Sequence, residues 1–414
     1  MTIAQTQRLT SVDEARRIVL EQAATLGTEQ VALATSLGRA VARDLIADEA
    51  LPPFDNSAMD GYALWSTDTD GATKDHPVTL RLVGEVAAGT VLTRALSRGE
   101  TVKIMTGAPL PPGANSVVML EEARLRGGLV EIFKPVPPDC HVRKAGEDIT
   151  RGEIAVRAGT RIRVQHLGLL AGLGHAHLSV FRLPSVAVLA TGSELVDVNE
   201  PLAPGKIRNS NSLVLVALLR RLGLAPIDLG VVVDDRSLIR QQLEDTVKSD
   251  VLLISGGVSV GEHDLVKRVL GALGMETLFW RVNMKPGKPL LFGRWRGKMV
   301  FGLPGNPISC VVCFLEFIAP FVRKTMGVED PDNGLVAARL TQALRKHEPR
   351  TQLFTAHLQD DQGALVVTPT PQQGSGMLNS LAHANAFIVV PEDVTELGAG
   401  SLVDVLPLGG DQWL

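Results

Sequence analysis

The sequence predicts a multidomain protein of the α/β plus β class, with a parallel-sheet α/β domain, an inserted β domain and a C-terminal β domain. Three observations predict this class. The chain has 414 residues, too long for one core, because domains usually hold roughly 150 residues. Strand-like apolar runs alternate with helical patterns across residues 181–328, as they do around parallel sheets. Residues 48–146 and 329–414 instead hold short apolar runs between turn residues, which is typical of β domains.

The N-terminal part is expected to be a helical segment, residues 1–47, which residues 147–180 complete after the insertion. Ser11 and Glu14 have the spacing of a capping box, and apolar residues then follow at helical intervals until Gly27. The helices expected in this part cover residues 12–26, 33–47 and 164–173.

The two β domains are read from their short apolar runs. In the inserted domain, residues 48–146, strands are expected at 78–83, 101–105, 117–120 and 130–133. A Pro- and Asp-rich stretch at 329–334 opens the C-terminal domain, residues 329–414. Its strands are expected at 336–340, 364–369, 386–390 and 402–406.

The α/β domain, residues 181–328, carries the loops where we look for chemistry. Strands are expected at 185–190, 226–233, 251–255 and 277–282, and helices at 212–222, 236–248, 262–273 and 307–324. Ligands of such folds bind outside the carboxyl ends of the parallel strands. The loops that follow these strands are therefore candidate sites.

Composition excludes several classes of function. Lys and Arg number 41 and Asp and Glu number 45, so a net charge of −4 excludes a generally basic nucleic-acid-binding surface. Phe, Trp and Tyr number only 11, 4 and 1, too few for stacking platforms that bind single strands. Uncharged stretches at 104–120 and 164–181 contain Pro, Gly or His residues and are no membrane spans. We expect neither nucleic acid nor membrane as a partner.

The three cysteines fit a reducing compartment, because they are too few for a disulfide scaffold of this length. No basic start with an apolar h-region precedes the first helix, so a cytoplasmic location is expected. Cys310 and Cys313 lie in an apolar helical pattern without a second CxxC pair. We therefore expect buried thiols rather than a zinc or redox site.

The glycine-rich loop at 255–261 follows a buried strand and precedes a helix. Gly256, Gly257 and Ser259 could let a ligand approach the backbone beside free N–H groups, although a plain tight turn has the same pattern. The loop also matches the G-x-S-x-G elbow of serine hydrolases. Ser259 lies several residues beyond the expected strand end, and His347, His357 and His383 belong to another domain, which disfavours a hydrolase.

The segment 283–289 also favours an anion. Lys285 and Lys288 flank a Pro-Gly turn that Pro286 and Pro289 stiffen, so two ammonium groups stand on a rigid loop. A solvated hairpin tip is the alternative. Farther on, Asn306 and Pro307 have the residue types of an N-cap and a first helical position, which would put Ser309 near free N–H groups.

Three carboxylates follow three different strands: Glu194, Asp234 and Asp264. If the strand order brings them together, they could hold Mg²⁺, which takes one or two carboxylates plus substrate phosphates. Each of them alone could equally be a helix cap. The segment 52–63 is a structured loop that carries Asp60.

Together, these loops resemble the molybdopterin molybdenumtransferase family, of the MoeA and gephyrin E-domain type. The resemblance runs from about Ser11 to the C-terminus. It depends on eight motifs in one order: FDNSAMDGYA at 54–63, MTGAP at 105–109, GEDI at 146–149, TGSEL at 191–195, SGGVSVG at 255–261, KPGKP at 285–289, GLPGNP at 302–307 and QGS at 373–375.

The resemblance implies four subdomains in an elongated homodimer, one of them like the molybdopterin adenylyltransferases. It implies a reaction in which molybdate and adenylylated molybdopterin give molybdenum-loaded molybdopterin and AMP, with Mg²⁺ or a similar divalent cation. It also implies an active site shared between the inserted β domain of one subunit and the α/β domain of the other. Other proteins of cofactor biosynthesis are possible further partners.

The resemblance also implies roles for residues. Catalytic roles fall on Asp60, Thr106, Glu194, Asp234, Asp264, Lys285 and Lys288. Contacts to the molybdopterin substrate and the oxyanion fall on Gly256, Gly257, Ser259, Pro289, Ser309, Arg350 and Ser375. The metal is assigned to Glu194 and Asp264.

The chain departs from the family pattern at two places. Ser193 stands where members commonly have Asp, and Thr355 stands where a second Arg often follows Arg350. Two other functions stay open: a catalytically idle cofactor-binding or scaffold paralogue, and a molybdopterin adenylyltransferase. Intact Asp60, Lys285 and Lys288 argue against the first, and the β insertion argues against the second. Tungstate instead of molybdate also stays open.

Overall fold

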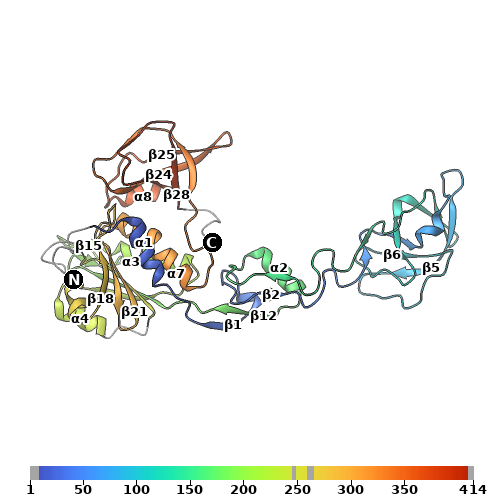
Figure 1. The fold of residues 1–414 in the computed structure, drawn as a ribbon, viewed down its shortest axis with the longest axis horizontal. Helices are drawn as coiled ribbons and strands as arrows, with labels where there is room; N and C mark the ends of the chain where they lie inside the picture. The colour runs from blue at the N-terminus through green and yellow to red at the C-terminus, as the bar shows by residue number, and fades with distance from the viewer. Residues whose placement is uncertain (1–8, 245–248, 259–264, 409–414) are drawn as a thin grey trace.

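The computed structural model describes residues 9–244, 249–258 and 265–408, and these form an elongated molecule. Figure 1 shows the α/β domain and the C-terminal β domain at one end and the inserted β domain, with β5 and β6, at the other. A small middle part around β1, β12 and α2 lies between them. No described helix is long and apolar enough to cross a membrane.

The α/β domain is built on a six-stranded sheet in the order β16-β13-β17-β21-β20-β18. The four strands from β16 to β21 are parallel, as the alternating pattern predicts. The strands are β13 (Val186–Thr191), β16 (Ile227–Val232), β17 (Val251–Ser255), β18 (Glu276–Trp280), β20 (Leu291–Trp295) and β21 (Lys298–Leu303).

The sheet also has an antiparallel edge, which the sequence analysis did not predict. β20 runs antiparallel to both β21 and β18, and the sequence analysis missed β20 and β21. The reason is a two-residue hairpin turn in which Arg296 and Gly297 both have positive φ, 49° and 77°. Because β18 is antiparallel to β20, it points in the same direction as the parallel strands.

Helices cover both faces of this sheet. Alternate residues of β13 enter different cores: Val186 and Val188 pack with α3 and α6, whereas Ala187 and Leu189 pack with α4 and α5. The helices are α3 (Ser210–Arg221), α4 (Arg236–Glu244), α5 (Leu265–Ala272), α6 (Pro307–Cys313) and α7 (Ala319–Thr325), with a π-helical turn over Phe314–Ile318 between the last two.

The first helix, α1 (Val12–Glu21), has the predicted N-cap, because Ser11 Oγ accepts a hydrogen bond from the Glu14 N–H at 3.2 Å. It ends well before Gly27. Ala15 and Val19 are buried in the same core as α6 and α7. The helix therefore packs in the α/β domain, which corrects the expectation that it forms one unit with residues 147–180.

The middle part has its own small core around Val41, Ile162 and Val180. The expected helix over 33–47 is absent: only a 3₁₀ turn (Leu33–Thr35) and the short strand β2 form there. Its apolar residues instead pack against residues more than a hundred positions away, so their spacing along the chain does not indicate a helix. The elements are β1 (Thr28–Ala32) with β12 (His177–Phe181), β2 (Leu45–Ile46) with β11 (Ile154–Val156), and the predicted helix α2 (Val164–Gly172).

The inserted domain is a six-stranded sheet in the order β7-β4-β6-β5-β9-β8. Its four predicted strands form, close to the expected bounds. The strands are β4 (Gly61–Leu64), β5 (Val78–Val86), β6 (Glu100–Ile104), β7 (Ser116–Met119), β8 (Ala123–Arg126) and β9 (Leu129–Ile132), and β3 (Asn56–Ser57) pairs with β10 (Val142–Arg143) beside them.

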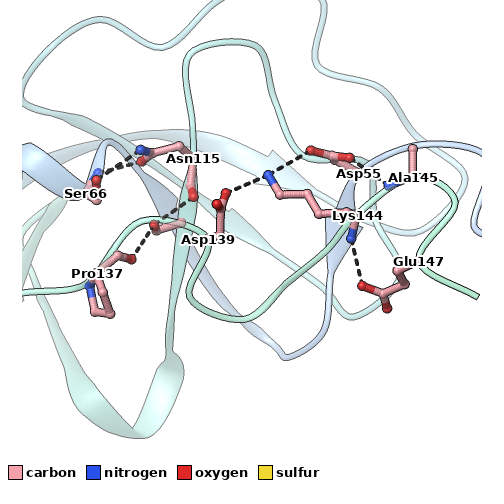
Figure 2. A network of polar contacts seen from close by, with 9 residues as sticks. Asp55, Ser66, Asn115, Pro137, Asp139, Lys144, Ala145 and Glu147 are labelled. Carbon is pink, nitrogen blue, oxygen red and sulfur yellow. Dashed lines mark hydrogen bonds and ion pairs between the residues drawn. The ribbon is translucent and has the colours of Figure 1, made fainter.

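The neck between the middle part and the inserted domain consists of two chain segments that are tied together. Lys144 Nζ lies 3.2 Å from Asp55 Oδ2 and 2.6 Å from Asp139 Oδ1 (Figure 2). The Ala145 N–H donates to Asp55 at 2.8 Å, and this bond, together with Lys144, lowers the pKa of Asp55 against the opposing effect of burial. The loop that carries Asp60 begins at this anchored point.

The C-terminal domain is a sheet in the order β19-β24-β25-β22-β28-β26, closed by a further pairing of β24 with β26. Its predicted strands form, and the sheet also takes in β19, which belongs to the loop with Lys285. The elements are β19 (Met284–Lys285), β22 (Val336–Leu340), β24 (Thr351–Asp361), β25 (Ala364–Pro369), α8 (Leu378–His383), β26 (Ala386–Val390) and β28 (Leu402–Pro407).

Candidate active site

The carboxyl ends of β13, β16, β17 and β21 meet at one edge of the α/β sheet, as parallel strands must. Asn211, near the start of α3, joins two of these ends: its Nδ2 donates to Ser255 Oγ at 2.9 Å and to Gly305 O at 2.8 Å. Its Oδ1 is buried without a hydrogen-bond partner among the described residues. An acceptor is thus available at this edge.

The glycine pair after β17 is required by a close approach of two backbones. Gly256 and Gly257 have φ of +98° and +64°, and a Cβ on Gly256 would lie 2.3 Å from Thr191 O. Packing against the end of β13 therefore explains these two glycines without a ligand. Ser259 and Asp264, which follow in the same loop, lie outside the described residues.

The loops after β13 and β16 hold one another by reciprocal hydrogen bonds. The Ser193 N–H donates to Asp234 Oδ2 at 3.2 Å, and the Asp234 N–H donates to Ser193 Oγ at 3.0 Å. Lys206 Nζ adds a bond to Ser193 O at 2.6 Å. Ser193 thus braces the loop that presents Glu194. The cap on α4 comes from Asp235, whose Oδ1 accepts from the N–H groups of Ser237 and Leu238.

The lysine loop after β18 is a packed structure, not a freely solvated tip. A Cβ on Gly287 (φ +112°) would lie 2.0 Å from Met284 Cε and 3.0 Å from Cys313 Sγ. Cys313 Sγ donates to Gly287 O at 3.7 Å, so the turn rests on α6. Lys285 and Lys288 stand on either side of this anchored turn, which Pro289 follows.

The C-terminal domain docks onto the lysine loop. Met284 and Lys285 pair in parallel with Thr351 and Gln352 of β24, which brings Arg350 next to Lys285. Glu348 lies between the two cations: its Oε1 is 3.6 Å from Lys285 Nζ, and its Oε2 is 2.7 Å from Arg350 Nη1. Two of the predicted oxyanion donors are therefore neighbours.

A second contact of the same domain meets the start of α6. Asn306 occupies the predicted N-cap position, but its side chain donates to Ser375 Oγ at 3.0 Å rather than capping the helix. The Ile308 N–H donates to Ser375 O at 3.1 Å. Ser309, which is buried, follows in the first turn of α6. Ser375 and Ser309 thus meet at one helix start.

The two cysteines of α6 are core thiols, as predicted. Burial raises the pKa of Cys310 to about 12 and raises that of Cys313 well above its ordinary value. Thiols that stay protonated at neutral pH are poor nucleophiles and poor metal ligands.

The inserted domain brings together the other two predicted residues. Asp60 Oδ1 accepts hydrogen bonds from Thr106 Oγ1 and from the Thr106 N–H, both at 2.7 Å. These bonds, the hydroxyl first, lower the pKa of Asp60. In one chain the inserted domain, which carries this pair, lies at the opposite end of the molecule from the α/β domain (Figure 1).

Sequence models of known families match this chain in three consecutive segments. They are described as the MoeA N-terminal region (domain I and II) over residues 10–174, a probable molybdopterin binding domain over 187–324, and the MoeA C-terminal region (domain IV) over 337–408.

Full-length relatives decide the family. The chain is 36% identical over 410 residues to the molybdopterin molybdenumtransferase of Bacillus subtilis, covering 97% of this chain and 95% of the relative. It is 37% identical over 406 residues to molybdopterin molybdenumtransferase 2 of Mycobacterium tuberculosis, covering 96% and 99%. The chain belongs to the molybdopterin molybdenumtransferase family.

A solved structure agrees with this family assignment. The crystal structure of a molybdopterin biosynthesis MoeA protein from Pyrococcus horikoshii superposes with a TM-score of 0.83 at 34% identity, covering 97% of this chain and 100% of that one. The predicted fold class, a mixed α/β and β multidomain chain, is confirmed. Nothing in the comparisons favours the idle paralogue or the adenylyltransferase.

Thr355, one of the two departures from the family pattern, has a structural role in the C-terminal domain. Thr355 is only 2% exposed. Its Oγ1 contacts Thr370 Oγ1 at 2.6 Å and Gln373 Oε1 at 3.1 Å, while its N–H donates to Gln373 Oε1 at 3.0 Å. A buried hydroxyl thus holds the loop with Ser375, and a guanidinium would find no solvent there.

The sequence analysis missed three polar residues in or near this site: Asn211, Glu348 and Arg281. Glu348 has no motif around it, and its position depends on the pairing of β19 with β24, more than sixty residues apart. Arg281 lies two residues before the lysine loop with φ +75°, and its buried Nε has no hydrogen-bond partner among the described residues. Non-glycine residues at positive φ are uncommon, but that signal exists only in three dimensions.

Proposed function

We propose that this member of the family transfers molybdenum from molybdate to adenylylated molybdopterin and releases AMP. The observation that carries the proposal is the meeting of Lys285 and Arg350, from two domains, at the carboxylate of Glu348. The start of α6, which Ser375 contacts, is a second candidate anion-binding feature of the α/β domain. Two cations and a helix N-terminus suit a tetrahedral dianion such as molybdate. Ser309 and Ser375 add hydroxyl donors at that helix start.

The proposed catalytic effect is mainly electrostatic. Negative charge develops on the leaving AMP phosphate and on an oxygen that departs from molybdenum. Cations on a rigid loop stabilise such charge because they need little reorganisation when the reaction occurs. Lys285, Lys288 and Arg350 are the residues to which we assign this role.

A divalent cation would find suitable donors in this part of the molecule. The described residues contain no group of three or more His, Cys, Asp or Glu side chains placed to hold a metal. Mg²⁺ needs only one or two carboxylates when substrate phosphates complete its shell. Glu194 would be one of them, and Asp264, outside the described residues, the other. Such an ion would neutralise phosphate charge.

We propose further that the active protein is a homodimer with shared sites, and that it works in the cytoplasm. The support for the dimer is the separation of Asp60 and Thr106 from the lysine loop within one elongated chain. A symmetric pair can bring the inserted domain of each subunit to the α/β domain of the other. The absence of disulfides among the three cysteines fits a reducing compartment.

The direct test is an assay of AMP release from adenylylated molybdopterin with Mg²⁺, in the presence and absence of molybdate. We expect release that depends on molybdate and falls by at least about tenfold in Lys285→Ala, since such a loss corresponds to one well-placed charge. Tungstate in a parallel assay would measure the preference between the two oxyanions. Molybdate-independent release would favour a different activity.

A further inference from the structure

Glu348 stands between the two cations that we assign to molybdate. Its two oxygens face different partners, Oε1 toward Lys285 Nζ at 3.6 Å and Oε2 toward Arg350 Nη1 at 2.7 Å. A tetrahedral oxyanion held by the same two cations would also point one oxygen at each of them. The carboxylate therefore lies where the edge of such an anion would lie.

Hydrogen bonds hold the backbone around these three residues in place, whereas the Glu348 side chain is partly exposed to solvent. Asn283 Nδ2 donates to Pro349 O at 3.0 Å, and the Thr351 N–H donates to Asn283 O at 3.1 Å. Lys346 Nζ donates to Arg350 O at 2.7 Å. By contrast, the side chain of Glu348 is 40% exposed. Its Oε2 is buried beside Arg350 without a hydrogen-bond partner among the described residues, so only the ion pair holds that oxygen.

We propose that Glu348 is an internal counter-anion, which occupies the oxyanion site of the ligand-free protein and leaves its cations when molybdate binds. The inference rests on the proposed function, because it takes Lys285 and Arg350 as the oxyanion donors. A dianion and a carboxylate cannot both contact this pair of cations, since like charges at contact distance repel strongly outside bulk water. Glu348 thus sets how tightly the enzyme binds its oxyanion.

The proposal predicts that removal of the carboxylate charge tightens anion binding. Glu348→Gln keeps the shape of the side chain, but binding no longer requires two ion pairs to separate. Partly exposed ion pairs are individually weak, so we expect the Kd of molybdate to fall by about three- to tenfold. Equilibrium dialysis with labelled molybdate measures this directly. In steady state, KM for molybdate should fall while kcat changes little.

Perrhenate distinguishes displacement from simple repulsion at a distance. It is a tetrahedral oxyanion like molybdate but carries one negative charge instead of two. If Glu348 leaves the site, every oxyanion meets the same displacement cost, and Glu348→Gln lowers the Kd of both anions by the same factor. If Glu348 stays nearby and only repels the anion, the repulsion is proportional to the charge of the anion. Glu348→Gln then increases the affinity for molybdate by a factor whose logarithm is about twice that for perrhenate.

Two further variants serve as controls. Glu396→Gln removes a comparable exposed carboxylate in the same domain, paired with Arg345 at 3.2 Å, and should leave both Kd values unchanged. Lys285→Ala should weaken binding of both anions. If it does not, the assignment of the oxyanion site itself fails, and with it this part of the proposed function.

With that control satisfied, two outcomes would overturn the inference about Glu348. Unchanged or weaker anion binding in Glu348→Gln would mean that the carboxylate does not compete with the oxyanion for the two cations. If the logarithm of the affinity gain for molybdate is twice the logarithm of the gain for perrhenate, the carboxylate acts from outside the site.

Discussion

Asp60 and Thr106 form one unit, in which a single carboxylate oxygen accepts both the hydroxyl and the backbone N–H of the threonine, each at 2.7 Å. The two residues come from different strand ends, after β3 and after β6, and their motifs lie more than forty positions apart. The geometry needs a residue that offers two donors in one direction, which a threonine or a serine at 106 supplies. Asp60 is thereby fixed in orientation and in charge.

The first prediction concerns this charge. Because the Thr106 hydroxyl is the largest cause of the lowered pKa of Asp60, Thr106→Val should raise that pKa toward its ordinary value. The backbone N–H remains, so the rise should be partial. Thr106→Ser keeps both donors and should leave the pKa where it is. Carboxyl-carbon NMR titration of Asp60 measures all three proteins, and an unchanged pKa in Thr106→Val would contradict the assignment.

The sign of this shift has a consequence for activity. A carboxylate with a lowered pKa stays ionised as the pH falls, and it becomes protonated only below its ordinary range. Asp60 should therefore cause no loss of activity between pH 5 and pH 8 in the wild-type enzyme, as these are values well above the ordinary pKa of about 3.9. An acidic limb of the pH–rate profile in that window must come from another group.

The second prediction tests whether two subunits build one site. Asp60→Ala and Lys285→Ala should each lose at least about tenfold in activity as homodimers, whereas their hybrid keeps one intact site. After random mixing, half of the dimers are hybrids and half of their sites are intact, so roughly a quarter of wild-type activity should return. Lys285→Ala mixed with Lys288→Ala is the matched control, since both changes lie on the same domain, and it should restore nothing.

If the mixture of Asp60→Ala and Lys285→Ala regains no activity although mass analysis shows that hybrids have formed, each active site lies within one chain. In that case the inserted domain would have to move far from its position in Figure 1. The mixing experiment therefore also tests whether the elongated form is the active one.

Much of the fold could be predicted because its strands are buried on both faces or alternate strictly. Residues 251–255 and 336–340 form β17 and β22 with the expected bounds. The helix predicted over residues 33–47 does not form. Its apolar residues pack in the core of the middle part, which residues beyond 150 complete, so their local spacing did not indicate the structure. The hairpin of β20 and β21 was not predicted, because Arg296 is an unusual residue for a turn position with positive φ.

Motifs located the candidate site far better than they explained it. Lys285, Arg350 and Ser375 are named by the resemblance, and the structure places them around the lysine loop and the start of α6. The carboxylate of Glu348 and the amide of Asn211 carry no local signal, since each is defined by partners in other domains or other strands. Such residues become visible only when the register between domains is known.

The third prediction concerns Gly287, which supports the lysine loop. Gly287→Ala and Gly297→Ala both place a Cβ on a residue at positive φ, +112° and +77°. Each should lower the free energy of unfolding by about 1 kcal/mol for that reason. Only at Gly287 does the new atom meet Met284 and Cys313, whereas nothing lies within 4 Å at Gly297.

Gly287→Ala should therefore lose about 1–3 kcal/mol more than its control in urea unfolding, because the buried Met284 and the turn beside Cys313 must shift to make room. The same shift moves Lys285 and Lys288, so KM for molybdate should rise in this variant alone. Equal losses of stability in the two variants would show that the turn yields at no cost, and the packing argument for a rigid lysine loop would then fail.

The fourth prediction concerns Thr355, the departure from the family pattern. Thr355→Val keeps the shape of the side chain but removes the hydroxyl that contacts Thr370, Gln373 and Ser380. Buried polar groups that lose a partner cost about 1–3 kcal/mol, so the free energy of unfolding should fall by that amount. Thr341→Val, which breaks an exposed hydroxyl pair with Thr368 in the same domain, should cost much less.

Steady-state kinetics of Thr355→Val distinguish an effect on substrate binding from an effect on the chemical step. Gln373 is held by Thr355 and lies two residues before Ser375, so a loosened loop should weaken the contact between Ser375 and the start of α6. We therefore expect KM for molybdate to rise in Thr355→Val while kcat stays within about twofold, as an effect on ground-state binding requires. A fall in kcat with unchanged KM would instead place the Thr355 network in the chemical step.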